Sequence, residues 1–107
     1  MSTQKKMYVL ARKDLDAVYG GVQAGHALAA YSLKGDLDLF KEWGNSDLIY
    51  LGVPNENVLK LWVQKLTAMK KAWVGFWEPD LQNQLTAVAC ISTEETFKNL
   101  RCLKNQR

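Results

Sequence analysis

The spacing of hydrophobic and polar residues predicts four strands and four helices along the chain. The stretch "MYVLA" is a short apolar run of the kind found in buried strands, and "AWVGFW" alternates like a strand with one buried face. Helical stripes begin after capping residues such as Asp36 and end at Gly35 and Gly44. Strands are therefore expected at 7–11, 47–53, 72–78 and 85–91, and helices at 21–33, 37–43, 56–71 and 92–103.

The order of these elements predicts the fold. The first three strands are separated by segments long enough for helical crossovers, which join parallel strands, whereas only the turn 79–84 separates the last two. We therefore expect an α/β protein, a single domain over residues 1–107 with a four-stranded mixed sheet between two layers of helices. The strand at 7–12 should lie inside the sheet, and the last two strands should form an antiparallel hairpin.

The composition is that of an ordinary globular domain. The 107 residues are 48% hydrophobic and 23% charged, and no apolar run reaches the roughly 20 residues of a membrane span. The apolar stretch in "MSTQKKMYVLARKDL" is too short for a signal peptide, so a cytoplasmic location without membrane association is expected. Cys90, Cys102 and the one histidine match no metal-binding spacing, so neither a metal nor another cofactor is expected.

The charge of the chain permits a polyanionic partner but does not require one, because the net surplus is only +3. The basic residues occur in small groups that either form solvated surfaces or follow the phosphates of a nucleic acid. These groups are Lys5–Lys6, Arg12–Lys13, Lys70–Lys71 and the series Lys98, Arg101, Lys104 and Arg107.

The segment "GGVQAGHALAA" places the only histidine, His26, on a helix of very small residues. A helix built for packing alone would use larger side chains, since each one buried contributes roughly 1.5–3 kcal/mol. The small residues indicate instead that the backbone closely approaches either the sheet or a ligand. His26 is either a structural residue that bonds to a backbone carbonyl or a group that relays a proton near neutral pH, and Gln23 shares its face of the helix.

The stretch "EPDLQNQLT" after the third strand gathers Glu78, Asp80, Gln84 and Thr86 in a short space. One interpretation is a polar hairpin turn, because Pro, Asp and Asn are turn residues. Short hairpin loops usually contain Gly, however, and the absence of Gly here favours a functional use of the polar groups. The hairpin should bring this turn beside the start of the first helix, so that His26, Asp80 and Thr86 converge around one cleft.

The end of the first strand and the first helix carry a recognisable set of residues: Arg12, Asp14, Leu15, Gln23, Gly25, His26, Ala27 and Tyr31. This set, followed in register by Trp43, "DLIYLGV" and "LTAVACI", resembles the type II peptidyl-tRNA hydrolases over almost the whole chain. Two departures accompany the resemblance. Tyr19 stands where the family has a lysine that is treated as catalytic, and "EPDLQNQLT" lacks the family's Arg and Gly-Thr, so either Glu78 or Asp80 aligns with the family's aspartate.

The resemblance implies hydrolysis of the ester between a peptidyl or N-blocked aminoacyl group and tRNA, without metal or cofactor. The catalytic residues it implies are Asp80 before Glu78, with His26 and Thr86. Contacts to tRNA are implied for Arg12, Lys13, Tyr19, Gln23, Gln84, Lys70 and Lys71. A homodimer is compatible with this function. The alternative is a catalytically impaired protein that binds a tRNA end or a nucleotide on the same fold, since the family's Lys and Arg are missing.

Overall fold

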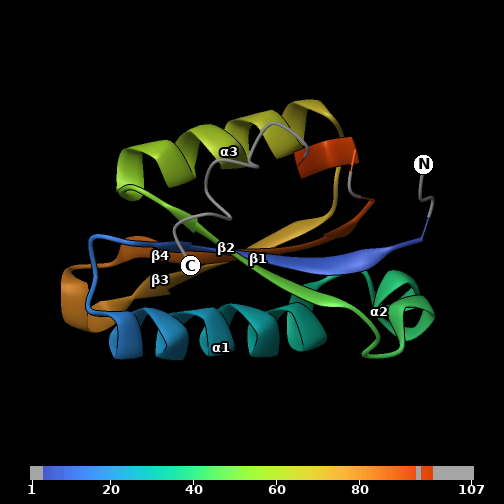
Figure 1. Cartoon of the computed structure of the whole chain (residues 1–107), viewed down its shortest axis with the longest axis horizontal. Helices are drawn as coiled ribbons and strands as arrows, with labels where there is room; N and C mark the ends of the chain where they lie inside the picture. The colour runs from blue at the N-terminus through green and yellow to red at the C-terminus, as the bar shows by residue number, and fades with distance from the viewer. Residues whose placement is uncertain (1–3, 94, 98–107) are drawn as a thin grey trace.

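The computed structural model describes residues 4–93 and 95–97, which form one sheet with helices on both faces (Figure 1). The strands are β1 (Lys6–Arg12), β2 (Leu48–Val53), β3 (Trp73–Glu78) and β4 (Gln84–Ser92). The helices are α1 (Ala17–Lys34), α2 (Leu37–Trp43) and α3 (Glu56–Ala68), and the 3₁₀ turn η1 (Pro79–Leu81) connects β3 to β4. The α/β fold and the mixed four-stranded sheet are confirmed.

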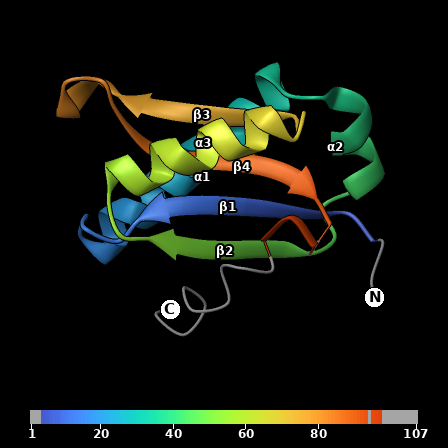
Figure 2. The same cartoon turned by 90° about the horizontal axis from the view of Figure 1, so that it is seen from above.

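The strands lie in the order β2-β1-β4-β3, so β1 is inside the sheet as expected. β1 pairs in parallel with β2 and antiparallel with β4, and β3 and β4 form the expected hairpin. The second crossover differs from a simple βαβ unit, because α3 passes over β1 and β4 and carries the chain to the opposite edge (Figure 2). As a result β1 and β3 run in the same direction without being neighbours, and both end on the same side of the molecule.

The sheet separates two hydrophobic cores. Figure 1 shows the helices that cover its two faces. On one face α3 packs against alternate residues of the strands, in a cluster that includes Leu10, Leu51, Leu59, Leu66 and Val88. On the other face α1 and α2 pack against the intervening residues, in a cluster that includes Met7, Val9, Ala27, Tyr31 and Trp43. β1 and β4 are covered on both faces, which explains why their sequences are almost continuously apolar.

The first helix begins earlier than the sequence predicts. The expected start at Gly21 is wrong, because Asp16 caps α1: its carboxylate accepts a hydrogen bond from the backbone N–H of Tyr19 at 3.3 Å. The expected end at Gly35 is confirmed. A Cβ at this position would lie 2.5 Å from the ring of Tyr31, so only glycine lets the chain leave the helix here. The predicted cap at Asp36 is also present, with a bond of 3.1 Å from Leu39.

The small residues of α1 have two different uses. Gly20 and Ala27 are buried against the sheet, whereas Gly21 and Gly25 are exposed beside β2. Close packing on the sheet, which the sequence predicts, therefore accounts for only part of the stripe.

Two further boundaries differ from those predicted. α3 ends at Ala68, not at residue 71, because Lys70 takes up the left-handed conformation, with φ of 58°. The last helix was expected at 92–103, but Ser92 still belongs to β4, and residues 95–97 form a 3₁₀ turn. Residue 94 and the remainder of that helix lie outside the described residues.

Candidate active site and a second cleft

The α1 side of the sheet carries a buried polar network at the end of β3, which we call the Gln23 network and which comprises Tyr19, Gln23, Glu78 and Thr86. The amide nitrogen of Gln23 donates to Oε1 of Glu78 at 2.9 Å, and the hydroxyl of Thr86 donates to Oε1 of Gln23 at 2.7 Å. The other carboxylate oxygen of Glu78 accepts the backbone N–H of Asp80 at 3.1 Å. Gln23 and Thr86 are fully buried and Glu78 is 8% exposed, so the carboxylate is held in one orientation.

A β-bulge directs Thr86 into this network. Alternation along β3 makes the side chains of Val74, Phe76 and Glu78 point toward α1. On β4 the register shifts, so that Ala87 pairs with Phe76 and Leu85 with Trp77. Thr86 is the extra residue, and its side chain points to the α1 face together with that of Ala87. Bulges of this kind redirect a side chain at the cost of one pairing position, and they are frequent next to active sites.

The surroundings of Glu78 keep it ionised at neutral pH. Its pKa is lowered, first by the hydrogen bond from Gln23 and then by the N–H of Asp80, with smaller contributions from His26 and Tyr19. The pKa of Tyr19 is raised by desolvation and by the negative charges of Glu78 and Asp80, so its hydroxyl stays protonated. Among the described residues, no Lys or Arg forms an ion pair with Glu78. The site therefore holds an anion by means of neutral donors.

A second polar group, the Arg12 cluster (Arg12, Asp14, Glu56 and Gln84), lies at the same end of the sheet on the α3 side. Arg12 binds both carboxylate oxygens of Asp14, at 3.0 and 2.8 Å, and donates to the side chain of Gln84 at 2.8 Å and to the carbonyl of Leu85 at 3.3 Å. Glu56, the first residue of α3, accepts the N–H of Leu85 at 2.9 Å. The bidentate bond lowers the pKa of Asp14. These contacts fasten the end of β1 to the start of β4.

The predicted convergence of His26, Asp80 and Thr86 is only partly seen. Thr86 is inside the Gln23 network, but the side chain of Asp80 is exposed on η1 and contributes its backbone N–H alone. His26 is exposed and stacks on Phe76, with ring centres 4.4 Å apart and planes 9° from parallel. In place of Asp80, the structure brings Glu78 to the centre. Alternation along β3 explains this, since Glu78 is in phase with the buried residues and Asp80 lies beyond the strand.

Several residues predicted to contact substrate lie elsewhere. Arg12 and Gln84 are bonded to each other in the Arg12 cluster, so their polar groups are already engaged. Lys70 and Lys71 follow α3 and precede β3, whereas Glu78 ends β3. A six-residue strand spans on the order of 17 Å, so this strand separates the two lysines from the network. Tyr19 and Gln23 are the predicted binding residues that lie in the Gln23 network.

A cleft of about 320 Å³ lies at the carboxyl ends of β1 and β2, toward the other edge of the sheet from β3. Sequence reasoning places a ligand site at such ends, but it missed Tyr50, whose exposed ring lines the cleft from β2. The alternation of β2, which puts Leu48, Tyr50 and Gly52 on the α1 face, could have identified Tyr50 as a residue that lines the cleft. The residues that form the walls include Lys13, Leu15, Ala17, Gly20, Tyr50 and Gly52.

Comparisons with known proteins do not identify the chain: no protein-family model matches it, and no curated protein matches it. The resemblance to type II peptidyl-tRNA hydrolases therefore stays a prediction. Within residues 4–93 and 95–97, no group of three or more His, Cys, Asp or Glu side chains is placed to hold a metal ion. No helix in this part of the chain has the length and apolar character needed to cross a membrane.

Proposed function

We propose that the protein hydrolyses the ester bond between a peptidyl or N-blocked aminoacyl group and the 3′ end of tRNA. The observation that carries the proposal is the buried, ionised carboxylate of Glu78, which Gln23 and a backbone N–H orient and with which no Lys or Arg of the described residues forms an ion pair. A carboxylate offers about four acceptor positions. Gln23 and the N–H of Asp80 use two of them, which leaves acceptor positions for a water molecule.

In this mechanism Glu78 orients the attacking water and accepts its proton as the water adds to the ester carbonyl. The bond between the acyl carbon and the ribose oxygen then breaks, and Glu78 returns the proton to this oxygen, which leaves as a hydroxyl of the tRNA. An ester needs no metal for this step when a base and hydrogen-bond donors are positioned around the carbonyl. The protonated hydroxyl of Tyr19 is a donor of this type, in place of the lysine that the resemblance would lead us to expect. Gln23 and Thr86 act as positioning residues, because Gln23 donates to Glu78 and Thr86 donates to Gln23 inside the protein.

The second candidate is a protein that binds the same tRNA end without cleaving it. It is favoured by the lowered pKa of Glu78, since a carboxylate with a low pKa is a weak base. In that case the network would orient a bound hydroxyl or amide group. Tyr19 in place of a lysine would then be part of the loss of catalysis.

The test measures the release of N-acetyl-amino acid from N-acetyl-aminoacyl-tRNA. We expect hydrolysis by the unmodified protein and a loss of at least about a hundredfold in Glu78→Gln, the usual effect of removing a general base. Asp80→Asn is the matched control, because it removes a carboxylate two residues away whose side chain points to solvent. It should change the rate by less than about threefold.

The opposite result, a large loss in Asp80→Asn and none in Glu78→Gln, would contradict the assignment of Glu78. A protein that releases no amino acid but retains tRNA on a filter would support the second candidate. Tyr19→Phe then separates the two roles of the network, since it removes one donor and leaves the carboxylate in place.

A further inference from the structure

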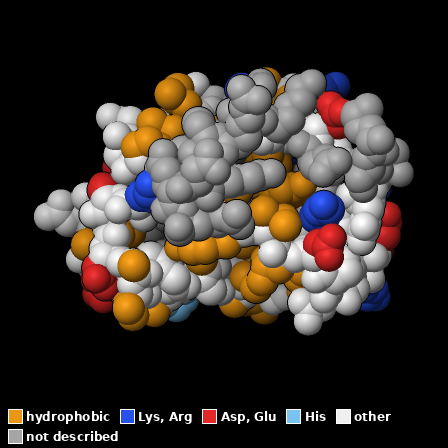
Figure 3. Space-filling view, viewed as in Figure 1, with side chains coloured by type: hydrophobic (Ala, Val, Ile, Leu, Met, Phe, Trp, Pro, Cys, Tyr) orange, Lys and Arg blue, Asp and Glu red, His pale blue; other side chains and the backbone are white. Residues whose placement is uncertain are grey.

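The ring of His26 forms the outer layer of an aromatic stack at the β3 edge of the sheet. The imidazole lies on the ring of Phe76, with ring centres 4.4 Å apart and planes 9° from parallel. β3 is an edge strand and His26 is exposed, so the stack ends at the surface. Figure 3 shows the histidine side chain at the surface on the α1 side of the molecule. In residues 4–93 and 95–97, Phe76 is the only ring that stacks on the imidazole, so the second face of the imidazole is open to a ligand.

The imidazole also lines a groove of about 440 Å³ between α1 and β3. The other walls are mostly small or apolar side chains, and the described residues that line the groove include one lysine but no carboxylate. They include Ala29, Ala30, Leu33, Lys34, Gly75 and Trp77. Aromatic and apolar walls with a cation suit a planar ligand that also carries negative charge. A nucleotide has this combination, because its base stacks on aromatic rings, histidine included, and its phosphate is an anion.

The stack lies next to Glu78. Phe76 and Glu78 are two residues apart on β3 and point to the same face, so their Cα atoms are about 7 Å apart. On α1, His26 lies one turn after Gln23, whose amide donates to Glu78 at 2.9 Å. The imidazole is also close enough to contribute to the lowered pKa of Glu78. A group bound on His26 is therefore beside the carboxylate that the proposed mechanism uses.

We infer that His26 is a stacking platform for the terminal adenine of the tRNA, which lies on the face of the imidazole opposite Phe76. The choice of tRNA rests on the proposed function. In a nucleoside the base is bonded directly to the ribose, so a base on His26 places the ribose, which carries the ester, beside Glu78. The phosphates then extend along the groove toward Lys34, about two turns further along α1 and away from the negative charge of Glu78. In this role the imidazole binds the substrate and transfers no proton.

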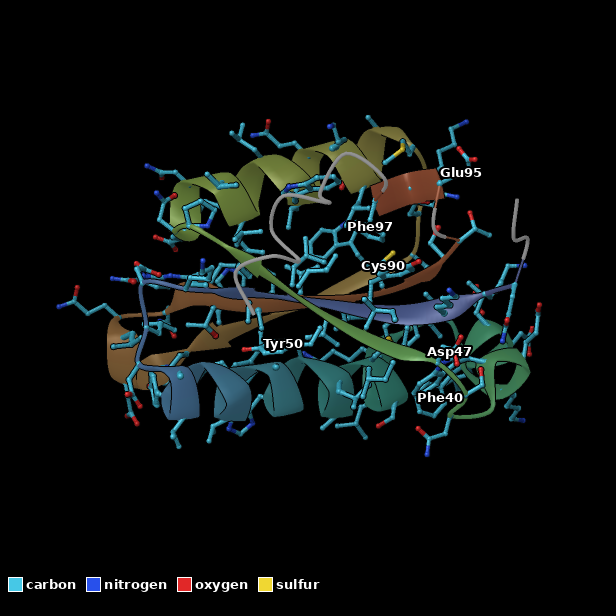
Figure 4. All side chains as sticks on the ribbon, in the orientation of Figure 1. Phe40, Asp47, Tyr50, Cys90, Glu95 and Phe97 are labelled. Carbon is cyan, nitrogen blue, oxygen red and sulfur yellow. The ribbon has the colours of Figure 1, made fainter. Side chains whose placement is uncertain are left out.

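The first measurement is the affinity of the full chain for adenosine 5′-monophosphate, by titration calorimetry or NMR. We expect His26→Ala to weaken binding at least about fivefold, because it removes the stacking ring. His26→Phe keeps a ring but cannot carry a proton, and it should bind within about twofold of the unmodified protein. The matched control is Tyr50→Leu, which removes an exposed ring at the opposite edge of the sheet, between β2 and α1 (Figure 4), and should leave the affinity unchanged.

The second measurement locates the nucleotide in the unmodified protein. A base stacked on His26 should move the NMR signals of the imidazole protons more than the amide signals of Gly20 and Gly52, which line the cleft at β1 and β2. The reverse order of shifts, equal affinity of His26→Ala and the unmodified protein, or no binding of the nucleotide would overturn the inference. Because His26→Ala also removes the contact with Phe76, affinities are compared at a temperature at which melting curves show every variant to be folded.

Failure of the inference can be told apart from failure of the proposed function. If His26→Ala hydrolyses N-acetyl-aminoacyl-tRNA with unchanged KM, the hydrolase proposal stands and the stacking platform is wrong. If the expected variant pattern of nucleotide binding is seen in a protein without hydrolytic activity, the platform stands and the hydrolase proposal is wrong. With both correct, His26→Ala raises KM more than it lowers kcat, and His26→Phe restores KM. A lower kcat with unchanged KM in both variants would assign the imidazole to proton transfer and contradict the platform.

Discussion

The Gln23 network and the Arg12 cluster lie at the same end of the sheet, on opposite faces, and they hold their carboxylates in different ways. In the Arg12 cluster, Asp14 is paired with a guanidinium through two hydrogen bonds of 3.0 and 2.8 Å. In the Gln23 network, Glu78 accepts bonds from the amide of Gln23 at 2.9 Å and from the backbone N–H of Asp80 at 3.1 Å. Both carboxylates have a lowered pKa, but only that of Asp14 is lowered by a cation as the largest cause.

The difference separates a structural role from a chemical one. A bidentate arginine satisfies a carboxylate and fixes its position, which suits the joint between β1 and β4. Neutral donors orient Glu78 as firmly, but among the described residues no Lys or Arg pairs with it. A carboxylate that no guanidinium occupies can interact with a substrate, so the comparison favours the Gln23 network as the reactive site.

The largest expected effect on stability comes from breaking the Arg12 cluster. Arg12→Met leaves Asp14, Gln84 and the carbonyl of Leu85 without their donor. We expect the free energy of unfolding to fall by about 2–3 kcal/mol, since hydrogen bonds to charged groups are worth about 1.5–3 kcal/mol. Urea denaturation measures the change. Arg12→Lys keeps the charge without the bidentate geometry and should give an intermediate loss. An unaltered denaturation midpoint in Arg12→Met would mean that the cluster does not fasten the sheet.

A smaller loss is expected from the Gln23 network. Gln23→Leu removes a donor to Glu78 and an acceptor of Thr86, but the hydroxyl of Thr86 retains the carbonyl of Phe76 at 3.3 Å. We expect a loss of about 1–2 kcal/mol in the free energy of unfolding. The matched variant is Thr86→Val. The double variant Gln23→Leu/Thr86→Val should lose less free energy of unfolding than the sum of the two single losses, because both single variants break the same bond. Strict additivity would show that this bond is not formed in solution.

Much of the fold follows from short-range patterns in the sequence. Some features depend only on residues within one turn or one strand, and these are found where they were expected. They are the apolar runs of β1 and β4, the helix cap at Asp36 and the helix end at Gly35. The start of α1 was missed because the two glycines at 20 and 21 argued against a helix. The cap at Asp16 and packing against the sheet outweigh their low helix propensity.

The candidate site was less predictable, because it depends on contacts between distant segments. Alternation along β3 could have favoured Glu78 over Asp80, since Val74 and Phe76 share its phase. The bulge that turns Thr86 toward Gln23 leaves no local signal, however, because it arises from the pairing of β3 with β4. The edge position of β2, which exposes Tyr50, likewise depends on the path of α3 across the sheet.

The smallest expected effect is a pH dependence that distinguishes the two carboxylates. The pKa of Glu78 is lowered from 4.5 and that of Asp14 from 3.8, so in acid the unfolded chain binds protons that the folded protein does not. Their contribution to stability is therefore complete above these ordinary values and is lost as the pH falls through the lower pKa values of the folded protein. The melting temperature should decrease on acidification below about pH 5.

Two variants assign this acid loss to its source. Glu78→Gln cannot titrate, but its amide oxygen can still accept the bond from Gln23, so the decrease in melting temperature between about pH 5 and pH 3 should be smaller than in the unmodified protein. Arg12→Met removes the bond that lowers the pKa of Asp14, so it should also reduce the decrease, by a smaller amount, because the Asp14 side chain is 41% exposed and its pairing is weakened by solvent. The same acid dependence in Glu78→Gln as in the unmodified protein would mean that Glu78 is not held as an anion by Gln23, and the contrast between the two polar clusters would then disappear.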